Sequence, residues 1–433
     1  MNETRLFAVA GNPVLHSKSP RMFNAAFKAR GIDAVYVRLS AICAEEIADT
    51  IRELNIKGAN ITSPFKEDII PFLDALDVQA EVIGAVNTVI NNGGRLTGYN
   101  TDHIGVSRAL GTVDNRVGRK RAVIAGAGGA ARAALFSCVR DGYDTVIINR
   151  TYERARSLAR RFGCRANRQE EIENEVSDGD ILILCLSSSN NNMMKQLSRE
   201  RLIILDARYG KKVTPYNAGA KDAIFIDGLQ WLLFQGAESF RLFTGCEPPL
   251  REMSEALYAK NGPSRDKVSF VGFMGAGKST IGLSVAKLSS MTFVDIDSLV
   301  EETTGQAIDG IFKNEGEKIF REYEKTGLEA ALRRHRAVIS TGGGAVIDER
   351  NIRDLRAHSL VVWLFAGIEK TYSRIGSGGK RPLAARDKDL LELFKERAAS
   401  YARASHLLVR TDRSTVREIT ERIGNESDNA FKG

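Results

Sequence analysis

Short apolar runs alternate with amphipathic helical stretches along the N-terminal part of this 433-residue chain. Strand-like apolar runs occupy 6–10, 34–38, 59–62 and 85–90, and helical periodicity covers 21–30 and 44–54. Strands that alternate with helices are typical of layered α/β domains. The pattern therefore predicts an α/β fold from the first residues onward.

A second strand–helix unit begins near Arg121 and contains a glycine-rich turn. The apolar run 122–125 precedes Gly126-Ala-Gly128-Gly129-Ala130-Ala131, and a helix is predicted from there through Val139. A G-x-G-x-x-A turn between a strand and a helix is typical of dinucleotide-binding (Rossmann) folds, although by itself it is a weak signal. Strands predicted at 181–186 and 202–206 extend this sheet, and a long helix is predicted at 228–243.

The strand at 145–148 indicates which dinucleotide binds. At its end, NAD-binding folds usually carry a carboxylate for the ribose 2′-hydroxyl, but this chain has Asn149, Arg150 and Thr151, with Arg154 a turn later. A guanidinium suits a 2′-phosphate, so the sequence favours NADP(H). The alternative is an arginine that is merely solvated at the strand end. The predicted NADP-binding residues are Gly126, Gly128, Gly129, Ala130, Asn149, Arg150, Thr151, Arg154 and Gly228.

A phosphate-binding loop opens the C-terminal part of the chain. Residues 272–280 read Gly-Phe-Met-Gly-Ala-Gly-Lys-Ser-Thr, which fits G-x-x-x-x-G-K-[ST] between an apolar strand at 268–271 and a helix. Backbone N–H groups of such a loop cradle phosphate oxygens, a lysine reaches the β- and γ-phosphates, and a hydroxyl holds Mg²⁺. The motif therefore predicts that Lys278 binds the β- and γ-phosphates and that the Ser279 hydroxyl binds Mg²⁺. The alternative is a glycine turn that binds no ligand.

Composition limits the classes of partner. The net charge is +8, but the basic clusters at 116–121 and 333–336 lack interleaved aromatic residues, so we expect no nucleic-acid partner. No apolar run reaches the ~18 residues of a membrane span, and the N-terminus lacks the apolar segment of a signal peptide. The five scattered cysteines are typical of reduced thiols. We expect a cytoplasmic protein with small-molecule substrates and no membrane partner, either a monomer or a homodimer.

Residues 1–258 resemble shikimate dehydrogenase. The motifs are Gly11-Asn-Pro13 with His16-Ser-Lys-Ser-Pro20, then Asn60-Ile-Thr-Ser-Pro-Phe-Lys66, Gly84-Ala-Val-Asn-Thr88 and Gly98-Tyr-Asn-Thr-Asp102. The resemblance implies that Lys66 and Asp102 form the catalytic pair. It also implies substrate contacts from Ser17, Ser19, Thr62, Asn87, Thr101, Tyr209 and Gln235. From the residues alone, Lys66 would be a surface lysine and Asp102 a helix N-cap.

Two positions depart from that family. The loop 185–194 reads Cys-Leu-Ser-Ser-Ser-Asn-Asn-Asn-Met-Met instead of the usual Asn-x-Thr-x-x-Gly-Met beside the cofactor, and Trp231 stands where a methionine often packs near the nicotinamide. The altered loop leaves the strictness of NADP over NAD open.

Residues 267–425 resemble shikimate kinase. The motifs after the P-loop are Phe293-Val-Asp-Ile-Asp297, Gly316-Glu-x-x-Phe-Arg-x-x-Glu324, Ser340-Thr-Gly-Gly-Gly-Ala345, a glycine-rich lid with Arg381-Pro-Leu, and Arg397 with Tyr401. The resemblance implies that Asp297 orients and deprotonates the 3-hydroxyl of shikimate and that Asp295 helps to order Mg²⁺ through water. Alternate positions on a strand face opposite sides, so the two aspartates are expected to have separate tasks unless the strand ends there.

The remaining implied kinase residues bind the two substrates. The resemblance implies that Arg321 and Arg397 bind the carboxylate of shikimate and that Gly343 and Gly344 add backbone contacts. The ATP-binding set is Gly275, Ala276, Gly277, Lys278, Ser279, Thr280 and Arg381.

These patterns predict a bifunctional enzyme with NADP(H), ATP and Mg²⁺ as cofactors. The expected domains are a substrate domain at 1–105 joined by helices 236–258, a Rossmann domain at 106–235, a linker at 259–266, a P-loop kinase at 267–425 and a frayed tail at 426–433. The predicted reactions are reduction of 3-dehydroshikimate to shikimate and phosphorylation of shikimate at its 3-hydroxyl. In the alternatives, the first half acts on quinate or aminoshikimate, or only binds and acts as a scaffold.

Overall fold

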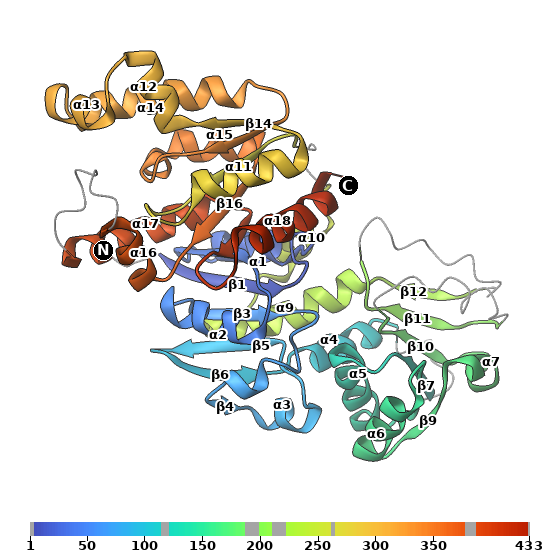
Figure 1. Cartoon of the computed structure of the whole chain (residues 1–433). Helices are drawn as coiled ribbons and strands as arrows, with labels where there is room; N and C mark the ends of the chain where they lie inside the picture. Colours follow the sequence, from blue (N-terminus) through green and yellow to red (C-terminus); the bar gives the residue numbers. More distant parts are fainter. Residues whose placement is uncertain are drawn as a thin grey trace. The chain divides into compact units, whose positions relative to one another are not determined.

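The computed structural model describes residues 4–113, 121–186, 199–209, 222–260, 265–376 and 387–431, drawn as ribbon in Figure 1. The chain forms two compact units. The first contains Met1–Pro20, Ile32–Thr62 and Lys260–Gly433, and the second contains Arg21–Gly31 and Ser63–Ala259. Within the described residues, no helix is both long and apolar enough to cross a membrane.

The first unit is built on parallel strands. In its C-terminal part the strand order is β14-β15-β13-β16-β17, and every pair is parallel. The strands are β13 (Val268–Val271), β14 (Thr292–Asp295), β15 (Ala337–Ser340), β16 (Leu360–Phe365) and β17 (Leu407–Arg410). β16 is buried at every position, as expected for a central parallel strand that is covered on both faces.

Helices connect and cover these strands. They are α11 (Lys278–Ser289), α12 (Ile296–Thr304), α13 (Ile308–Asn314), α14 (Glu317–Leu332), α15 (Glu349–His358), α16 (Ile368–Gly376), α17 (Asp387–Ala404) and α18 (Val416–Phe431). The expected frayed tail from 426 is wrong for the part that is described. The helix α18 continues to Phe431, and Glu426 and Ser427 are 1% and 5% exposed.

The N-terminal strands of the chain continue the same parallel sheet. β1 (Arg5–Gly11) pairs with β2 (Ala34–Ser40) and with β3 (Gly58–Ile61), and β2 pairs with β17 through Leu39↔Leu408 and Ser40↔Val409. α2 (Ala44–Glu53) follows β2. The first unit therefore joins strands from the two ends of the chain, a pairing that the sequence pattern did not indicate.

The second unit contains a parallel six-stranded sheet in the order β12-β11-β10-β7-β8-β9. This is the doubly wound dinucleotide-binding order, with the first strand at the centre. The strands are β7 (Arg121–Ala125), β8 (Asp144–Asn149), β9 (Arg165–Arg168), β10 (Ile181–Leu184), β11 (Ile203–Asp206) and β12 (Ile224–Ile226). Apolar clusters pack on this sheet, one of them around Leu135, Ile147 and Trp231.

The rest of the second unit carries the remaining elements. They are α1 (Ser19–Ala29, which begins in the first unit), β4 (Ala75–Leu76), α3 (Val78–Ile83), β5 (Thr88–Asn92), β6 (Arg95–Tyr99), α4 (Asp102–Gly111), α5 (Gly129–Arg140), α6 (Tyr152–Phe162), α7 (Ile172–Glu175), α9 (Gly228–Thr244) and α10 (Leu250–Tyr258). The predicted α/β fold and its parallel sheets are confirmed.

Candidate active sites

Lys66 and Asp102 form a direct ion pair in the second unit. The Nζ of Lys66 donates to Oδ2 of Asp102, and the two side chains are only 17% and 7% exposed. Asp102 is the first residue of α4, whose N-cap position belongs to Thr101. The carboxylate is therefore turned toward the lysine and does not cap its own helix, which removes the N-cap alternative.

A buried polar cluster contains three of the predicted substrate residues. Asn87 Nδ2 donates to Thr101 Oγ1 and to Gln235 Oε1, both at 3.0 Å, and Asn87 Oδ1 accepts from the Thr101 backbone N–H at 2.7 Å. Ser239 Oγ lies 3.1 Å from Thr101 Oγ1 and 2.9 Å from Thr88 Oγ1. Ser239, which the sequence analysis did not single out, supports this cluster one helical turn after Gln235.

The glycine-rich turn after β7 lies against Lys66. Gly126 has φ +118°, and a Cβ there would lie 2.5 Å from the carbonyl oxygen of Cys185. A Cβ at Gly129 would lie 2.9 Å from Cβ of Lys66. Backbone N–H groups at the start of α5 can bind a pyrophosphate, and no acidic residue occupies its first turn. The turn therefore has the open backbone that suits the pyrophosphate of a dinucleotide, and it lies next to Lys66.

Arginines stand where the ribose of a dinucleotide is expected. Arg150 is exposed directly after β8, and Arg154 is exposed in the first turn of α6. Asn149 Nδ2 donates to the Thr151 carbonyl at 2.9 Å, which fixes the turn between them. Gly228 begins α9, where a Cβ would lie 2.5 Å from the carbonyl oxygens of Asp206 and Arg208. Packing alone explains a glycine there, and its contact with NADP stays a prediction.

The other dehydrogenase predictions are distributed between the units. Ser17, Ser19 and Thr62 belong to the first unit, where Ser17 and Ser19 are buried and their hydroxyl oxygens lie 3.2 Å apart. Tyr209, in the second unit, is half-buried. Trp231 is 4% exposed and packs on α4, since a Cβ at Gly105 would lie 2.6 Å from its ring. In the altered loop, residues 187–194 lie outside the described residues.

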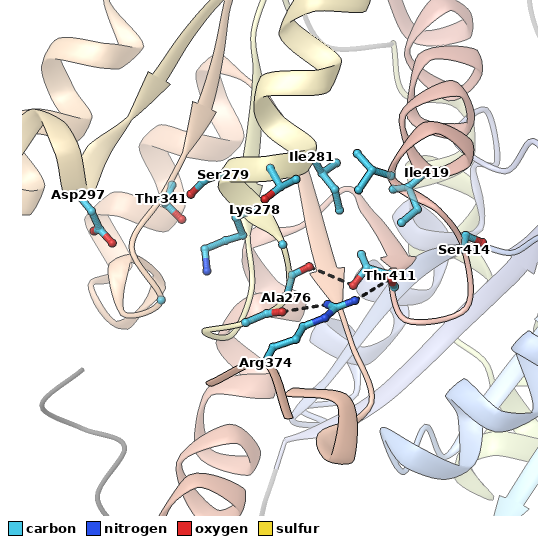
Figure 2. A pocket seen from close by; sticks show the side chains of 15 residues that line it. Ala276, Lys278, Ser279, Ile281, Asp297, Thr341, Arg374, Thr411, Ser414 and Ile419 are labelled. Atoms are coloured by element: carbon cyan, nitrogen blue, oxygen red, sulfur yellow. Dashed lines mark hydrogen bonds between the residues drawn. The ribbon is translucent and has the colours of Figure 1, made fainter. Parts of the chain in front are cut away.

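The P-loop of the first unit lines a cavity of about 430 Å³ (Figure 2). Gly272, Gly275 and Gly277 have φ values of +143°, +77° and +91°, conformations that favour glycine. The Lys278 ammonium donates to the carbonyl oxygens of Gly272 and Phe273 at 2.8 and 3.1 Å. The cavity wall includes all six predicted P-loop residues, Gly275, Ala276, Gly277, Lys278, Ser279 and Thr280.

Asp295 and Ser279 form the candidate magnesium site. Ser279 Oγ donates to Asp295 Oδ2 at 2.6 Å. Asp295 Oδ1 also caps α12 by accepting from the N–H groups of Asp297 and Ser298 at 3.1 and 3.3 Å. The sequence analysis put both aspartates on one strand, which is wrong for Asp297: β14 ends at Asp295, and Asp297 lies in the first turn of α12. A hydroxyl and a carboxylate are oxygen ligands of the kind that Mg²⁺ prefers.

The predicted acceptor-binding residues converge on the Gly342–Gly344 turn. A side chain at Gly344 would overlap the guanidinium of Arg321, and one at Gly342 would meet Asp297. The Gly343 carbonyl accepts from Arg397 Nη1 at 3.4 Å and from the Tyr401 hydroxyl at 2.5 Å. The three-glycine turn is thus needed so that charged side chains can approach its backbone.

The sequence analysis gave no role to three residues of this region. Arg374 donates to the Gly275 carbonyl at 3.0 Å, and Thr411 Oγ1 donates to the Ala276 carbonyl at 3.0 Å, so both hold the P-loop (Figure 2). Glu324 is 1% exposed and accepts from Arg321 at 2.8 Å. Burial raises the pKa of the Glu324 carboxyl, with Arg321 opposing that shift. The R-x-x-E spacing on α14 could have indicated Glu324, whereas Arg374 and Thr411 have no motif around them. Arg381 and most of the lid lie outside the described residues.

Comparisons with known proteins match both parts of the chain. Family models match as shikimate dehydrogenase substrate binding domain (9–89), shikimate/quinate 5-dehydrogenase (109–222), shikimate 5′-dehydrogenase C-terminal domain (228–258) and shikimate kinase (274–427). A Pyrococcus furiosus shikimate dehydrogenase (NADP(+)) is 39% identical over 268 residues, which cover 59% of this chain and 96% of the relative. The chain belongs to the shikimate dehydrogenase family. Its C-terminal part is a shikimate kinase domain.

Solved shikimate dehydrogenases show the same fold. One in complex with NADP⁺ is 35% identical and covers 59% of this chain and 94% of its own, with a TM-score of 0.53. A Thermus thermophilus shikimate dehydrogenase in complex with NADP(H) and shikimate is 32% identical. The match covers 58% of this chain and 98% of the Thermus chain, with a TM-score of 0.51. The dehydrogenase part is therefore matched over nearly the full length of these relatives, and the kinase part extends beyond it.

Proposed function

We propose that this chain catalyses two consecutive reactions. Its dehydrogenase part reduces 3-dehydroshikimate to shikimate with NADPH, and its kinase part phosphorylates shikimate to shikimate 3-phosphate with Mg-ATP. The product of the first reaction is the acceptor of the second, so two independently matched parts share one metabolite.

The contact of Lys66 with both Asp102 and Gly129 carries the dehydrogenase proposal. Reduction of a ketone adds a hydride to carbon and a proton to oxygen. NADPH supplies the hydride when bound, and Lys66 holds the proton that neutralises the developing alkoxide. Asp102 keeps the ammonium oriented through their ion pair. Asn87, Thr101 and Gln235 present amide and hydroxyl groups that suit the hydroxyls and carboxylate of shikimate, together with Ser17, Ser19, Thr62 and Tyr209.

Arginines beside the dinucleotide turn support a preference for NADP(H). Arg150 and Arg154 can form charge-assisted hydrogen bonds with a 2′-phosphate. A carboxylate, which would hold the 2′-hydroxyl of NAD, does not stand at 149–151. The glycines of the turn and Gly228 complete the proposed NADP-binding set.

The convergence of Asp297 and Arg321 on the glycine turn beside the P-loop carries the kinase proposal. Phosphoryl transfer requires in-line positioning and neutralisation of charge. Asp297 accepts the proton of the 3-hydroxyl as that oxygen attacks the γ-phosphorus of ATP, and the bond from the γ-phosphorus to the β,γ-bridging oxygen breaks, which releases ADP. Arg321 and Arg397, with the Gly343 and Gly344 backbone, hold the carboxylate of shikimate. Lys278 and Arg381 neutralise the phosphates. Ser279 and Asp295 would hold Mg²⁺, which when bound neutralises the phosphate oxygens.

A coupled assay on the full chain tests the proposal. With 3-dehydroshikimate, NADPH and Mg-ATP, we expect NADPH oxidation followed by formation of shikimate 3-phosphate. Omitting ATP should leave NADPH oxidation intact, and added shikimate without NADPH should still be phosphorylated. Kinase activity without any NADPH oxidation would favour the scaffold alternative. Faster turnover of quinate or aminoshikimate would favour the other substrates.

A further inference from the structure

A buried carboxylate from the kinase domain binds the N-terminal loop of the dehydrogenase. Glu426 lies on α18 and is 1% exposed. Its two carboxylate oxygens accept from the Val14 backbone N–H at 3.0 and 3.1 Å, and Oε2 also accepts from the Leu15 N–H at 2.8 Å. All of these residues belong to the first unit. The contact spans 412 positions of the sequence.

The loop that Glu426 binds is the one that carries Ser17 and Ser19. The Ser17 N–H donates to the Val14 carbonyl at 3.0 Å, so the two amides that Glu426 holds lie at the start of the turn that places Ser17. On its other side, Arg38 donates to the Ser17 carbonyl at 3.0 and 2.6 Å. The loop is thus fixed at both ends of the turn, at one end by a kinase residue.

The strength of this contact comes from its charge and its burial. A buried backbone N–H needs an acceptor, and an ionised carboxylate accepts more strongly than a neutral group. The side chain of Glu426 has little freedom, because it is buried and both of its oxygens accept backbone N–H groups. One turn earlier on α18, Arg422 is also buried and donates to Glu46 at 2.9 Å. α18 therefore presents two fixed charged side chains to the N-terminal segment.

We propose that Glu426 is a positioning residue for the dehydrogenase, supplied by the kinase domain, which holds the Ser17–Ser19 loop in the geometry that binds the carboxylate-bearing substrate. The inference rests on the proposed substrate role of Ser17 and Ser19. Glu426 does not touch the substrate; it acts through the loop backbone. The dehydrogenase of this chain is accordingly complete only with the last helix of its kinase.

The test is Glu426→Gln in the full chain, assayed by shikimate oxidation with NADP⁺. A glutamine turns an NH₂ group toward an amide that needs an acceptor, so we expect KM for shikimate to rise about 10-fold. KM for NADP⁺ and the kinase kcat/KM should stay unchanged, and kcat of the dehydrogenase should change far less than KM. Glu426→Asp keeps the charge on a shorter side chain and should give a smaller rise.

Controls separate positioning from general destabilisation. Glu421→Gln changes an exposed carboxylate on the same helix and should leave every parameter unchanged. Ser17→Ala and Ser19→Ala should each raise KM for shikimate; if they do not, the proposed role of the serines fails. If the serine variants raise KM and Glu426→Gln does not, the positioning role is overturned. An equal loss of dehydrogenase and kinase activity in both Glu426 variants would also overturn it in favour of a purely structural role.

Discussion

At the scale of single residues, the environment of Lys66 distinguishes it from a solvated lysine. Its ammonium is paired with a carboxylate that is 7% exposed, and its stem packs against the glycine turn that suits a dinucleotide. Lysines are almost never buried unless they are paired. A partly buried, paired lysine beside a cofactor turn is placed for proton transfer.

Lys66→Ala should therefore lower the dehydrogenase kcat by about 100-fold or more, which is the usual contribution of general acid–base catalysis. NADPH affinity, measured by fluorescence titration, should survive, because the proposed cofactor contacts are the glycine turn and the arginines. Lys57→Ala, at a partly exposed lysine whose Nζ donates to Asn55 Oδ1, is the control. A parallel loss of NADPH affinity in the Lys66 variant would argue against a catalytic role.

Arg150→Ala should weaken NADPH binding far more than NADH binding, by roughly 10-fold or more, because only NADPH carries the 2′-phosphate that the guanidinium would bind. The ratio of KM values for the two cofactors measures this directly. Arg156→Ala is the matched control, because Arg156 lies nearby on α6 and its Nη1 lies 3.8 Å from Oε2 of Glu153. An unchanged ratio would refute the 2′-phosphate assignment.

At the scale of elements, the point where β14 ends sets the positions of Asp295 and Asp297. The strand stops at Asp295, which caps α12 and accepts from Ser279, so Asp297 is carried onto the helix and toward the glycine turn. Alternation along one strand would have sent the two side chains to opposite faces. The cap instead turns the chain so that Asp297 lines the P-loop cavity, while Asp295 accepts from Ser279 in the cavity wall.

Asp295→Asn should raise the Mg²⁺ concentration that half-saturates the kinase and lower its kcat/KM by about 10-fold or more, because the substitution removes the charge of a carboxylate that is proposed to order the metal. Asparagine caps a helix about as well as aspartate does, so the cap of α12 should survive the substitution. Asp348→Asn serves as the control, since Asp348 caps α15 by accepting from the Arg350 N–H at 2.7 Å. If the two variants respond alike to Mg²⁺, Asp295 has only a capping role.

Local patterns in the sequence predict most of the elements but few of the long-range contacts. The βα units, the glycine turn after β7 and the P-loop were predictable because each depends on residues close in sequence. The burial of Glu426, the pairing of β2 with β17 and the support of the P-loop by Arg374 were not. Each joins segments far apart in the chain, and no local period marks a glutamate as the acceptor for a distant loop.

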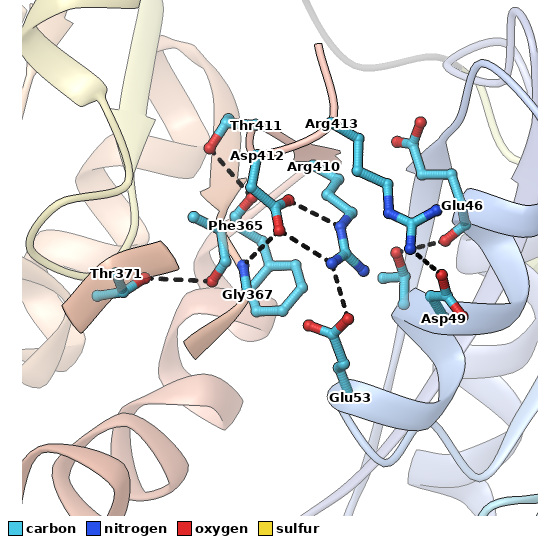
Figure 3. A network of polar contacts seen from close by, with 12 residues as sticks. Glu46, Asp49, Glu53, Phe365, Gly367, Thr371, Arg410, Thr411, Asp412 and Arg413 are labelled. Carbon is cyan, nitrogen blue, oxygen red and sulfur yellow. Dashed lines mark hydrogen bonds and ion pairs between the residues drawn. The ribbon is translucent and has the colours of Figure 1, made fainter. Parts of the chain in front are cut away.

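At the scale of the first unit, ion pairs link the N-terminal segment to the kinase strands. Figure 3 shows Arg410, at the end of β17, bound to Glu53 at 2.7 Å and to Asp412, while Arg413 pairs with Asp49. Next to Asp412, Thr411 lines the P-loop cavity. Residues 410–413, at and directly after the end of β17, thus serve two places. The side chains of Arg410 and Arg413 contact α2, and Thr411 lines the P-loop cavity.

The most deeply buried of these links is the pair of Arg422 with Glu46, whose side chains are 5% and 0% exposed. Removing one partner leaves an uncompensated buried charge, which costs ~3–5 kcal/mol. Glu46→Gln should therefore destabilise the kinase domain, although Glu46 lies in the dehydrogenase sequence. The measurement is the urea dependence of kinase activity and of Trp363 fluorescence, since Trp363 lies on β16.

The double variant Glu46→Leu/Arg422→Met should recover part of that loss, because it removes both charges together. Breaking the exposed pair Arg417–Glu421 on the same helix should leave the unfolding transition of the kinase nearly unchanged. If Glu46→Gln leaves the urea midpoint of the kinase unfolding transition at its wild-type value, the N-terminal strands and the kinase unfold independently. A shifted transition that the double variant partly restores would mean that the strands of the two parts, joined through β2 and β17, unfold as one cooperative unit, since only a shared unit passes the cost of a charge on α2 to the kinase fold.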